Sequence, residues 1–212
     1  MAARMGGAPP DRQAPCMPVR VLAVDDHLAV RHGLSDLLAE EEEIGLVGVA
    51  SNAREALIES LREAPDVAVV DYQLGHGQRD GLALSIMLRG LPRPPRVIVY
   101  SAYADSTLAV RALIAGADGL VSKGSLGTEV SWAIHAVAQN RRVLPPVVPE
   151  IAAALQARLD PDDQALLGLL LSGADDEEVA RVLRIGVDAL PARRRRMLET
   201  LEEPEPAGVR AL

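Results

Sequence analysis

Short apolar runs alternate with segments of helical spacing between residue 19 and about residue 140. An apolar run of about four to eight residues is typical of a buried strand, whereas apolar residues three and four apart are typical of an amphipathic helix. Regular alternation of the two predicts an α/β domain with a doubly wound, five-stranded parallel sheet. The predicted strands are 19–26, 44–51, 67–74, 96–102 and 118–123, and the predicted helices are 28–41, 52–64, 80–90, 105–116 and 126–140.

The pattern changes after Asn140. The segment 141–150, RRVLPPVVPE, carries three prolines, which suit neither a helix interior nor a central strand. We therefore predict that the first domain covers residues 19–141. A linker over 142–158 follows it and includes a helix at 150–158.

Residues 159–203 predict a second, smaller all-α domain. Apolar residues recur there at helical spacing, and turn signals at Ser172-Gly173 and around Gly186 divide the segment into three short helices. Asp175, with Glu178 three residues later, forms a variant of the capping box. The middle helix is therefore predicted to start at about Asp176.

Composition narrows the class of protein. Of 212 residues, 49% are hydrophobic and 25% are charged, with a net charge of −8, and no apolar run approaches the roughly 20 residues that span a bilayer. Cys16 is the single cysteine, which excludes an internal disulfide, and residues 1–18 lack the apolar core of a secretory signal. We expect a cytoplasmic protein whose ends, 1–18 and 204–212, are disordered. With no Phe, one Trp and three Tyr, the chain has too few rings to favour stacking on single-stranded nucleic acid.

Charged and polar residues stand at the ends of the predicted strands. The first strand ends in Asp25 and Asp26, the third delivers Asp71, the fourth Ser101 and the fifth Lys123. Ligands of an open parallel sheet sit at the carboxyl ends of its strands. We therefore expect three carboxylates, a hydroxyl and an ammonium group to meet at one edge.

This set of groups points to phosphoryl chemistry. Clustered carboxylates repel one another unless a hard cation neutralises them, and ligation by oxygen atoms alone suits Mg²⁺. One carboxylate is then free to attack phosphorus while the metal and the lysine offset charge on the phosphoryl oxygens. Asp71 is the predicted nucleophile because it ends the continuous apolar strand VAVVD. Asp25 and Asp26 lead into a helix and are predicted to act as ligands.

Four motifs in succession, VLAVDDH, VVDYQL, VIVYSAYAD and AGADGLVSK, carry a resemblance to a known family. Residues 19–141 resemble the receiver domain of two-component response regulators, which has a flavodoxin-like fold. The resemblance implies that a sensor histidine kinase donates a phosphoryl group to Asp71. It also implies no enzymatic activity beyond the domain's own phosphotransfer and self-dephosphorylation.

The same resemblance assigns the remaining roles. It implies that Mg²⁺ is bound by Asp26 and Asp71, with help from Asp25 and the carbonyl group of Gln73, and that Ser101 and Lys123 carry the switch. The chain departs from the family at two places. Leu74-Gly75 and the loop HGQRD replace the usual Met-Pro, and Leu120 replaces the usual aromatic residue three positions before the lysine.

The second domain resembles a LuxR-type helix-turn-helix through LDPDDQALLGLLLSG, DDEEVARVLRI and the arginine-rich helix that follows. Together with the receiver, it resembles the NarL/FixJ class of response regulators, which implies a homodimer that binds double-stranded DNA and regulates transcription. The third helix would enter the major groove, where Arg193, Arg195 and Arg196 reach phosphates or guanine edges. Helical spacing places Arg194 nearest the core.

The charge balance of the second domain keeps another function open. Residues 159–203 carry eleven acids and six arginines, an unfavourable balance for approaching DNA. The arginine run is alternatively a solvated face that balances the glutamates of the same helix, Glu199, Glu202 and Glu203, in a regulator that binds a protein partner. Pro191 is tolerated if Asp188 is the N-cap of the third helix, which we predict. A phosphohydrolase is the least favoured alternative, because Gln73 replaces the acid that it would require.

Overall fold

A computed structural model describes residues 17–75 and 80–202 of the chain. All five strands are parallel, and they are hydrogen-bonded in the order β2-β1-β3-β4-β5. The strands are β1 (Val19–Val24), β2 (Ile44–Ala50), β3 (Val67–Asp71), β4 (Arg96–Ser101) and β5 (Gly119–Ser122). The predicted doubly wound sheet is confirmed, and each strand ends one to three residues earlier than predicted.

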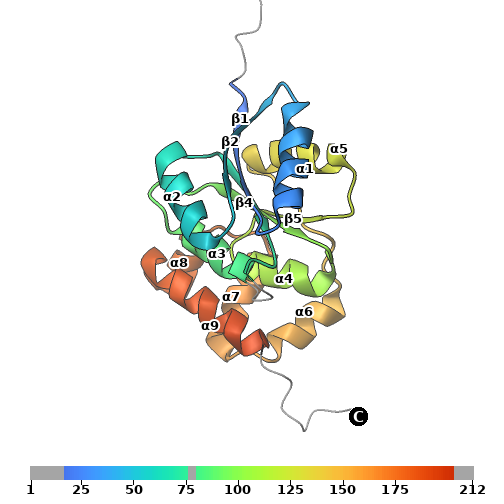
Figure 1. The fold of residues 1–212 in the computed structure, drawn as a ribbon. Coiled ribbons are helices and arrows are strands. Elements are labelled where there is room, and N and C mark those ends of the chain that lie inside the picture. Colours follow the sequence, from blue (N-terminus) through green and yellow to red (C-terminus); the bar gives the residue numbers. More distant parts are fainter. Residues whose placement is uncertain (1–16, 76–79, 203–212) are drawn as a thin grey trace, which may run out of the picture.

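Helices cover both faces of the sheet (Figure 1). On one face lie α1 (Leu28–Ala39) and α5 (Gly127–Ala138), and on the other lie α2 (Ala53–Glu63), α3 (Asp80–Arg89) and α4 (Ser106–Ile114). Strand β3 is buried throughout because it is central and has helices on both faces. The carboxyl end of β3 is consequently held rigidly, which fixes the position of Asp71.

Side-chain caps start the helices that follow the sheet edge. The side chain of Asn52 accepts a hydrogen bond from the backbone N–H of Glu55 at the start of α2, and Asp105 does the same for Leu108 at the start of α4. Each cap satisfies one of the free amide groups at a helix N-terminus. Helix α4 begins five residues beyond Ser101, so its N-terminus adjoins the carboxyl edge of the sheet.

Four further helices form the C-terminal module, residues 149–202. They are α6 (Pro149–Gln156), α7 (Pro161–Leu171), α8 (Asp176–Leu183) and α9 (Leu190–Glu202), with a 3-10 turn, η1, over Val187–Ala189. Asp160 caps α7 and Asp175 caps α8. The predicted start of the middle helix at Asp176 is confirmed.

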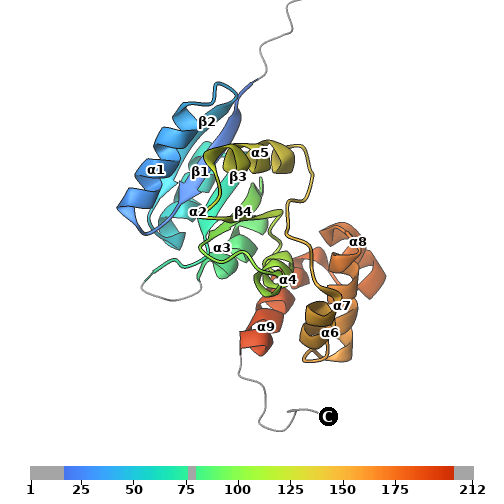
Figure 2. The same cartoon turned by 90° about the vertical axis from the view of Figure 1, so that its right-hand side faces the viewer.

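The C-terminal module packs against α3 and α4 of the α/β domain (Figure 2). One apolar cluster extends from β3 and β4 through α3 and α4 into α7, α8 and α9. Leu166, Leu167 and Met197 are fully buried in it. The two parts of the chain are therefore joined by a hydrophobic contact as well as by the covalent linker.

One local prediction is wrong. Asp188 is not the N-cap of the third helix, because it lies inside the 3-10 turn Val187–Ala189, whose own N-cap is Gly186. The turn accommodates Pro191 in another way. Pro191 is the second residue of α9, within the first turn, where a missing backbone N–H costs no intrahelical hydrogen bond.

Several predictions concern segments outside the described residues. The predicted disordered ends lie mostly or wholly there, as does most of the loop HGQRD after Leu74-Gly75. The predicted domain boundaries remain predictions. Among the helices that the structure describes, none is long and apolar enough to cross a membrane.

Candidate functional site

The carboxyl edge of the sheet brings the predicted site residues together. Asp25 and Asp26 follow β1, Asp71 ends β3, Ser101 ends β4, and Lys123 follows β5. Strands β1, β3, β4 and β5 are consecutive neighbours in the sheet, so their ends open on one edge. Asp25, Asp71 and Ser101 are almost fully buried.

Lys123 joins two of the carboxylates. Its Nζ lies 2.7 Å from Asp25 Oδ2 and 2.9 Å from Asp71 Oδ1, and it stands 5.7 Å from the centre of the Tyr100 ring. An ammonium group is a compact charge with three donors, so it can serve two carboxylates at once. Lys123 therefore holds Asp25 and Asp71 in place and partly neutralises both.

The pKa of Asp71 is raised above its ordinary value, because burial disfavours the charged carboxylate more than the hydrogen bond from Lys123 favours it. The nearby Asp25 adds to the rise. For Lys123, burial lowers the pKa, but the hydrogen bonds to Asp25 and Asp71 outweigh it and leave the pKa raised. The lysine therefore stays charged at neutral pH.

Asp26 completes an acidic cluster suited to a cation. Oxygen atoms of Asp25, Asp26 and Asp71 and a ring nitrogen of His27 all lie within 4.8 Å of one another. Asp26 Oδ1 is buried and accepts no hydrogen bond from the described residues, although His27 Nδ1 lies 2.7 Å away. An unused carboxylate oxygen among other carboxylates suits a hard divalent cation, so the donor set fits Mg²⁺.

The remaining predicted residues occupy the rim and core of the site. The backbone N–H of Gln73 donates to Asp71 Oδ1 at 3.2 Å, and the side chain of Gln73 is exposed. The Ser101 hydroxyl accepts a hydrogen bond from the backbone N–H of Tyr103 at 3.2 Å. Leu120, which stands where an aromatic residue was expected, is buried in the core.

Sequence reasoning missed two groups at this site. The ring of His27 lies beside Asp26, and no histidine is among the residues predicted for this site. Arg31 donates from Nη1 to the backbone carbonyl of Asp25 at 2.7 Å. The adjacency of His27 to Asp26 was the available signal, whereas Arg31 reaches the site only because α1 turns it back toward β1.

The predicted DNA-contacting arginines of α9 differ in their surroundings. Arg193 Nε donates to the buried Asp163 at 2.6 Å, and Arg196 Nη2 contacts Asp163 at 3.0 Å and Asp160 at 3.2 Å. Arg195 is exposed and makes no ion pair in the part of the chain that the structure describes. Arg194 is buried, as the helical spacing predicts.

Comparison with known proteins gives consistent matches. Residues 21–134 match the family described as the response regulator receiver domain. The DNA-binding transcriptional activator DevR/DosR of Mycobacterium tuberculosis is 34% identical over 177 residues, which cover 76% of this chain and 78% of that protein. The nitrate/nitrite response regulator protein NarL of Escherichia coli is 29% identical over 196 residues, covering 87% of this chain and 90% of that one.

A solved structure agrees with these matches. A LuxR-family two-component response regulator from Aurantimonas superposes with a TM-score of 0.56 at 30% identity, covering 64% of this chain and 94% of that chain. The receiver family spans more than half of the present sequence, and its four motifs supply the residues gathered at the sheet edge. The chain therefore belongs to the two-component response regulators that carry a receiver domain.

Proposed function

We propose that this chain is a phosphorylation-controlled transcription regulator, in which Asp71 accepts a phosphoryl group and the C-terminal module binds DNA. The observation that carries the first half is the position of Asp71. Its carboxylate ends the buried strand β3, lies 2.9 Å from Lys123 and shares an acidic cluster with Asp26. A fixed nucleophile beside a fixed cation is the arrangement that phosphoryl transfer requires.

The transfer itself follows from these groups. An oxygen of Asp71 attacks phosphorus of a phosphohistidine on the kinase, the P–N bond breaks, and the histidine nitrogen keeps the electron pair. The product is an acyl phosphate on Asp71, whose oxygens carry the charge that Lys123 offsets. Ser101, at the end of the adjacent strand, supplies a hydroxyl for one of those oxygens.

A divalent cation completes the proposed chemistry. Asp26 and Asp71, with help from Asp25 and the Gln73 carbonyl group, would hold Mg²⁺, which neutralises charge on the phosphoryl oxygens when bound. Asp25 also positions Lys123. Asp25 Oδ2 accepts a hydrogen bond from Lys123 Nζ at 2.7 Å, and Asp25 Oδ1 is held by the backbone N–H of His27 at 2.8 Å.

The DNA-binding half rests on the C-terminal helices and on the relatives. The name of DevR/DosR describes a DNA-binding transcriptional activator, and the match extends beyond the receiver into the C-terminal helices. Arg195 and Arg196 are exposed on α9, the helix that would enter the major groove. We propose that a homodimer presents two copies of this helix, and that the protein works in the cytoplasm.

A second candidate is favoured by the charge balance of the module. Carboxylates of α7 already engage Arg193 and Arg196, and residues 159–203 carry five more acids than arginines. A module with this balance suits a protein partner better than a phosphate backbone. Phosphorylation would then control a protein contact rather than a DNA contact.

The test uses the full-length protein, with and without phosphorylation by a small phosphodonor and Mg²⁺. Genomic fragments are captured on the protein and the bound sequences are titrated with salt. We expect a recurring sequence, recovered more strongly after phosphorylation, whose affinity falls steeply with salt. Asp71→Asn should take up no label and show no phosphorylation effect, whereas Asp36→Asn, an exposed carboxyl on α1, should behave as wild type.

The outcomes separate the two candidates. Absence of any recurring sequence in either state, with Asp71 demonstrably labelled, would reject DNA binding in favour of a protein partner. Label uptake by Asp71→Asn equal to that of the wild type would place the acceptor elsewhere. If DNA binds, Arg195→Ala with Arg196→Ala should reduce the salt slope by about one to two phosphate contacts.

A further inference from the structure

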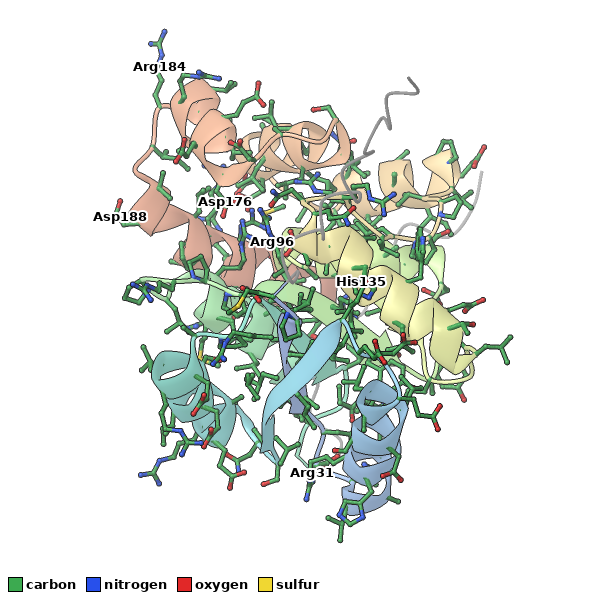
Figure 3. The ribbon with its side chains drawn as sticks, turned by 90° about the horizontal axis from the view of Figure 1, so that it is seen from above. Arg31, Arg96, His135, Asp176, Arg184 and Asp188 are labelled. Atoms are coloured by element: carbon green, nitrogen blue, oxygen red, sulfur yellow. The ribbon has the colours of Figure 1, made fainter. Side chains whose placement is uncertain are left out.

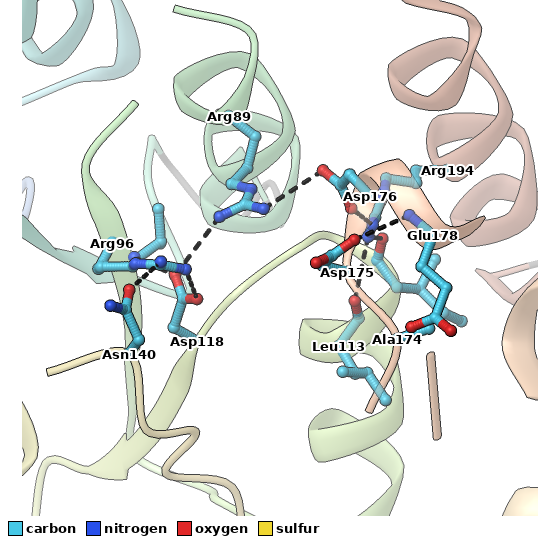
Figure 4. A network of polar contacts seen from close by, with 12 residues as sticks. Arg89, Arg96, Leu113, Asp118, Asn140, Ala174, Asp175, Asp176, Glu178 and Arg194 are labelled. Atoms are coloured by element: carbon cyan, nitrogen blue, oxygen red, sulfur yellow. Dashed lines mark hydrogen bonds and ion pairs between the residues drawn. The ribbon is translucent and has the colours of Figure 1, made fainter. Parts of the chain in front are cut away.

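Charged groups are balanced where the C-terminal module meets the receiver (Figure 4). Asp176 of α8 pairs with Arg194 of α9, and Asp176 Oδ2 lies 3.3 Å from Nη2 of Arg89 on α3. Arg194 Nη1 also donates to the carbonyl group of Ile114 at 2.6 Å. These groups satisfy one another, so the cleft that they line calls for no ligand.

The acidic cluster at the carboxyl edge of the sheet is different, because its charges are not balanced. Asp25, Asp26 and Asp71 carry three negative charges when ionised, and Lys123, which pairs with Asp25 and Asp71, carries one positive charge. A divalent cation would balance the excess of two among these four side chains. Asp26 Oδ1 is buried and accepts no hydrogen bond from the described residues, so this oxygen is available to such a cation.

His27 stands beside that unused oxygen. Its Nδ1 lies 2.7 Å from Asp26 Oδ1 and 3.4 Å from Asp25 Oδ1. Two ligand atoms that bind one cation at about 2.1 Å, with their bonds perpendicular, lie about 3 Å apart. The separation of Nδ1 and Asp26 Oδ1 is close to that value, so both atoms can bind the same ion.

The local structure leaves the His27 ring free for this role. His27 is the N-cap of α1, where the side chain of Ser, Thr, Asp or Asn usually accepts a hydrogen bond from the helix, yet the His27 side chain makes no such bond. Its backbone N–H donates to Asp25 Oδ1 at 2.8 Å, and Arg31 of α1 (Figure 3) donates to the Asp25 carbonyl group at 2.7 Å. These bonds fix the turn from β1 into α1 and keep the ring beside Asp26.

A ring nitrogen among the ligands changes which metal the cluster favours. Neutral imidazole adds a lone pair and no charge. Divalent transition-metal ions accept nitrogen ligands more readily than Mg²⁺, which favours oxygen. The side chain of His27 is 69% exposed, so Nε2 can carry the proton and face water while Nδ1 faces the ion.

We propose that His27 is a ligand of the cation in the acidic cluster, through Nδ1, and that it makes the site favour a divalent transition-metal ion such as Mn²⁺ over Mg²⁺. The inference rests on the proposed function in one respect, that a divalent cation binds at this cluster. It adds a nitrogen to the oxygen ligands of Asp26, Asp71 and the Gln73 carbonyl group. Mg²⁺ still binds through those oxygen atoms, but without a contribution from His27.

The test detects the ligand directly, by pulsed electron paramagnetic resonance of Mn²⁺ bound to the full-length, unphosphorylated protein. The histidines alone are labelled with a heavy nitrogen isotope. Because Mn²⁺ also binds sites made only of oxygen, the site fills whether or not His27 is a ligand, and coupling to the labelled nitrogen reports the histidine. We expect this coupling in the wild type and in His32→Gln, whose ring is exposed on α1, and its loss in His27→Gln.

Competition between Mn²⁺ and Mg²⁺ measures the preference on the same proteins. His27→Gln should weaken Mn²⁺ binding about tenfold and change Mg²⁺ binding by less than about twofold, because only the transition-metal ion uses the nitrogen. His32→Gln should match the wild type for both ions. Asp26→Asn should weaken the binding of both ions, since it removes an oxygen ligand that they share.

The outcomes separate this inference from the proposed function. Bound Mn²⁺ without coupling to histidine, or equal Mn²⁺ affinity of His27→Gln and the wild type, would overturn the role of His27 and leave a cation site made of oxygen ligands. Equal binding of both ions by Asp26→Asn and the wild type would overturn the cation site as well. Label uptake by Asp71 is measured in parallel, so a failure of phosphorylation is seen separately from a failure of metal preference.

Discussion

Two clusters of charge in this protein differ in their balance. At the carboxyl edge of the sheet, three carboxylates gather, those of Asp25, Asp26 and Asp71, and Lys123 pairs with the first and the last of them. On α9, three arginines pair at 3.2 Å or less with three aspartates of the same chain, namely Arg193, Arg194 and Arg196 with Asp160, Asp163 and Asp176. The first cluster has an excess of negative charge and the second is neutral.

The difference in balance separates a binding site from a structural contact. Buried carboxylates in excess cost stability in the folded chain unless a cation or a proton joins them, so their presence indicates a ligand. Balanced charges satisfy one another and need no ligand. The arginine run therefore serves folding and docking as much as recognition, and Arg195 is the member left for an external partner among the described residues.

The largest expected effect comes from breaking the neutral cluster. Asp163 is buried and pairs with both Arg193 and Arg196, so Asp163→Asn should lower the free energy of unfolding by about 3 kcal/mol, because it leaves a poorly solvated arginine without its charge partner. Urea unfolding measures the loss. The control is Asp162→Asn, whose carboxyl is 89% exposed and 3.9 Å from Arg193. Equal stability of the two variants would contradict the structural role of the pairing.

The next effect concerns the lysine of the receiver site. Lys123 is the one lysine among 22 basic residues, and Lys123→Gln should slow label uptake from a small phosphodonor about 100-fold, because the phosphoryl oxygens lose a fixed positive charge. Lys123→Arg should restore the rate only in part, since a planar guanidinium does not replace a compact donor between two carboxylates. A rate for Lys123→Gln close to that of the wild type would assign charge stabilisation to another group.

The sequence alone predicts the receiver site, but it does not predict the contact between the receiver and the C-terminal module. Strand ends and their acids follow from apolar runs, which are local, and Asp71, Asp26 and Lys123 lie where those runs end. The partners of α9 are far away in sequence: Arg194 meets Ile114 eighty positions earlier. Helical spacing predicts that Arg194 is buried, but no local pattern indicates which carbonyl groups accept its hydrogen bonds.

Removing the charge of Asp71 should stabilise the protein, whereas removing that of Asp163 should destabilise it. The raised pKa of Asp71 means that the folded protein disfavours its charge at neutral pH relative to the unfolded chain. Asp71→Asn removes that charge and should raise the free energy of unfolding by up to about 1 kcal/mol while abolishing phosphorylation. Thermal unfolding without Mg²⁺ tests this. A clear loss of stability would show that the Lys123 contact outweighs the cost of burial.

The smallest expected effect is a pH dependence of the stability that Asp176 contributes between the two parts of the chain. Burial raises the pKa of Asp176, but Arg194 from α9 and Arg89 from α3 outweigh it, so the pKa lies below the ordinary value of 3.8. The stabilisation from this carboxylate is therefore fully present above that value and is lost as the pH falls through the lowered pKa. The stability gap between the wild type and Asp176→Asn should stay constant around neutral pH and shrink in acid, as followed by urea unfolding. Asp36→Asn should show little gap at any pH, and a gap for Asp176→Asn that persists in acid would mean that its charge does not stabilise the contacts with Arg89 and Arg194.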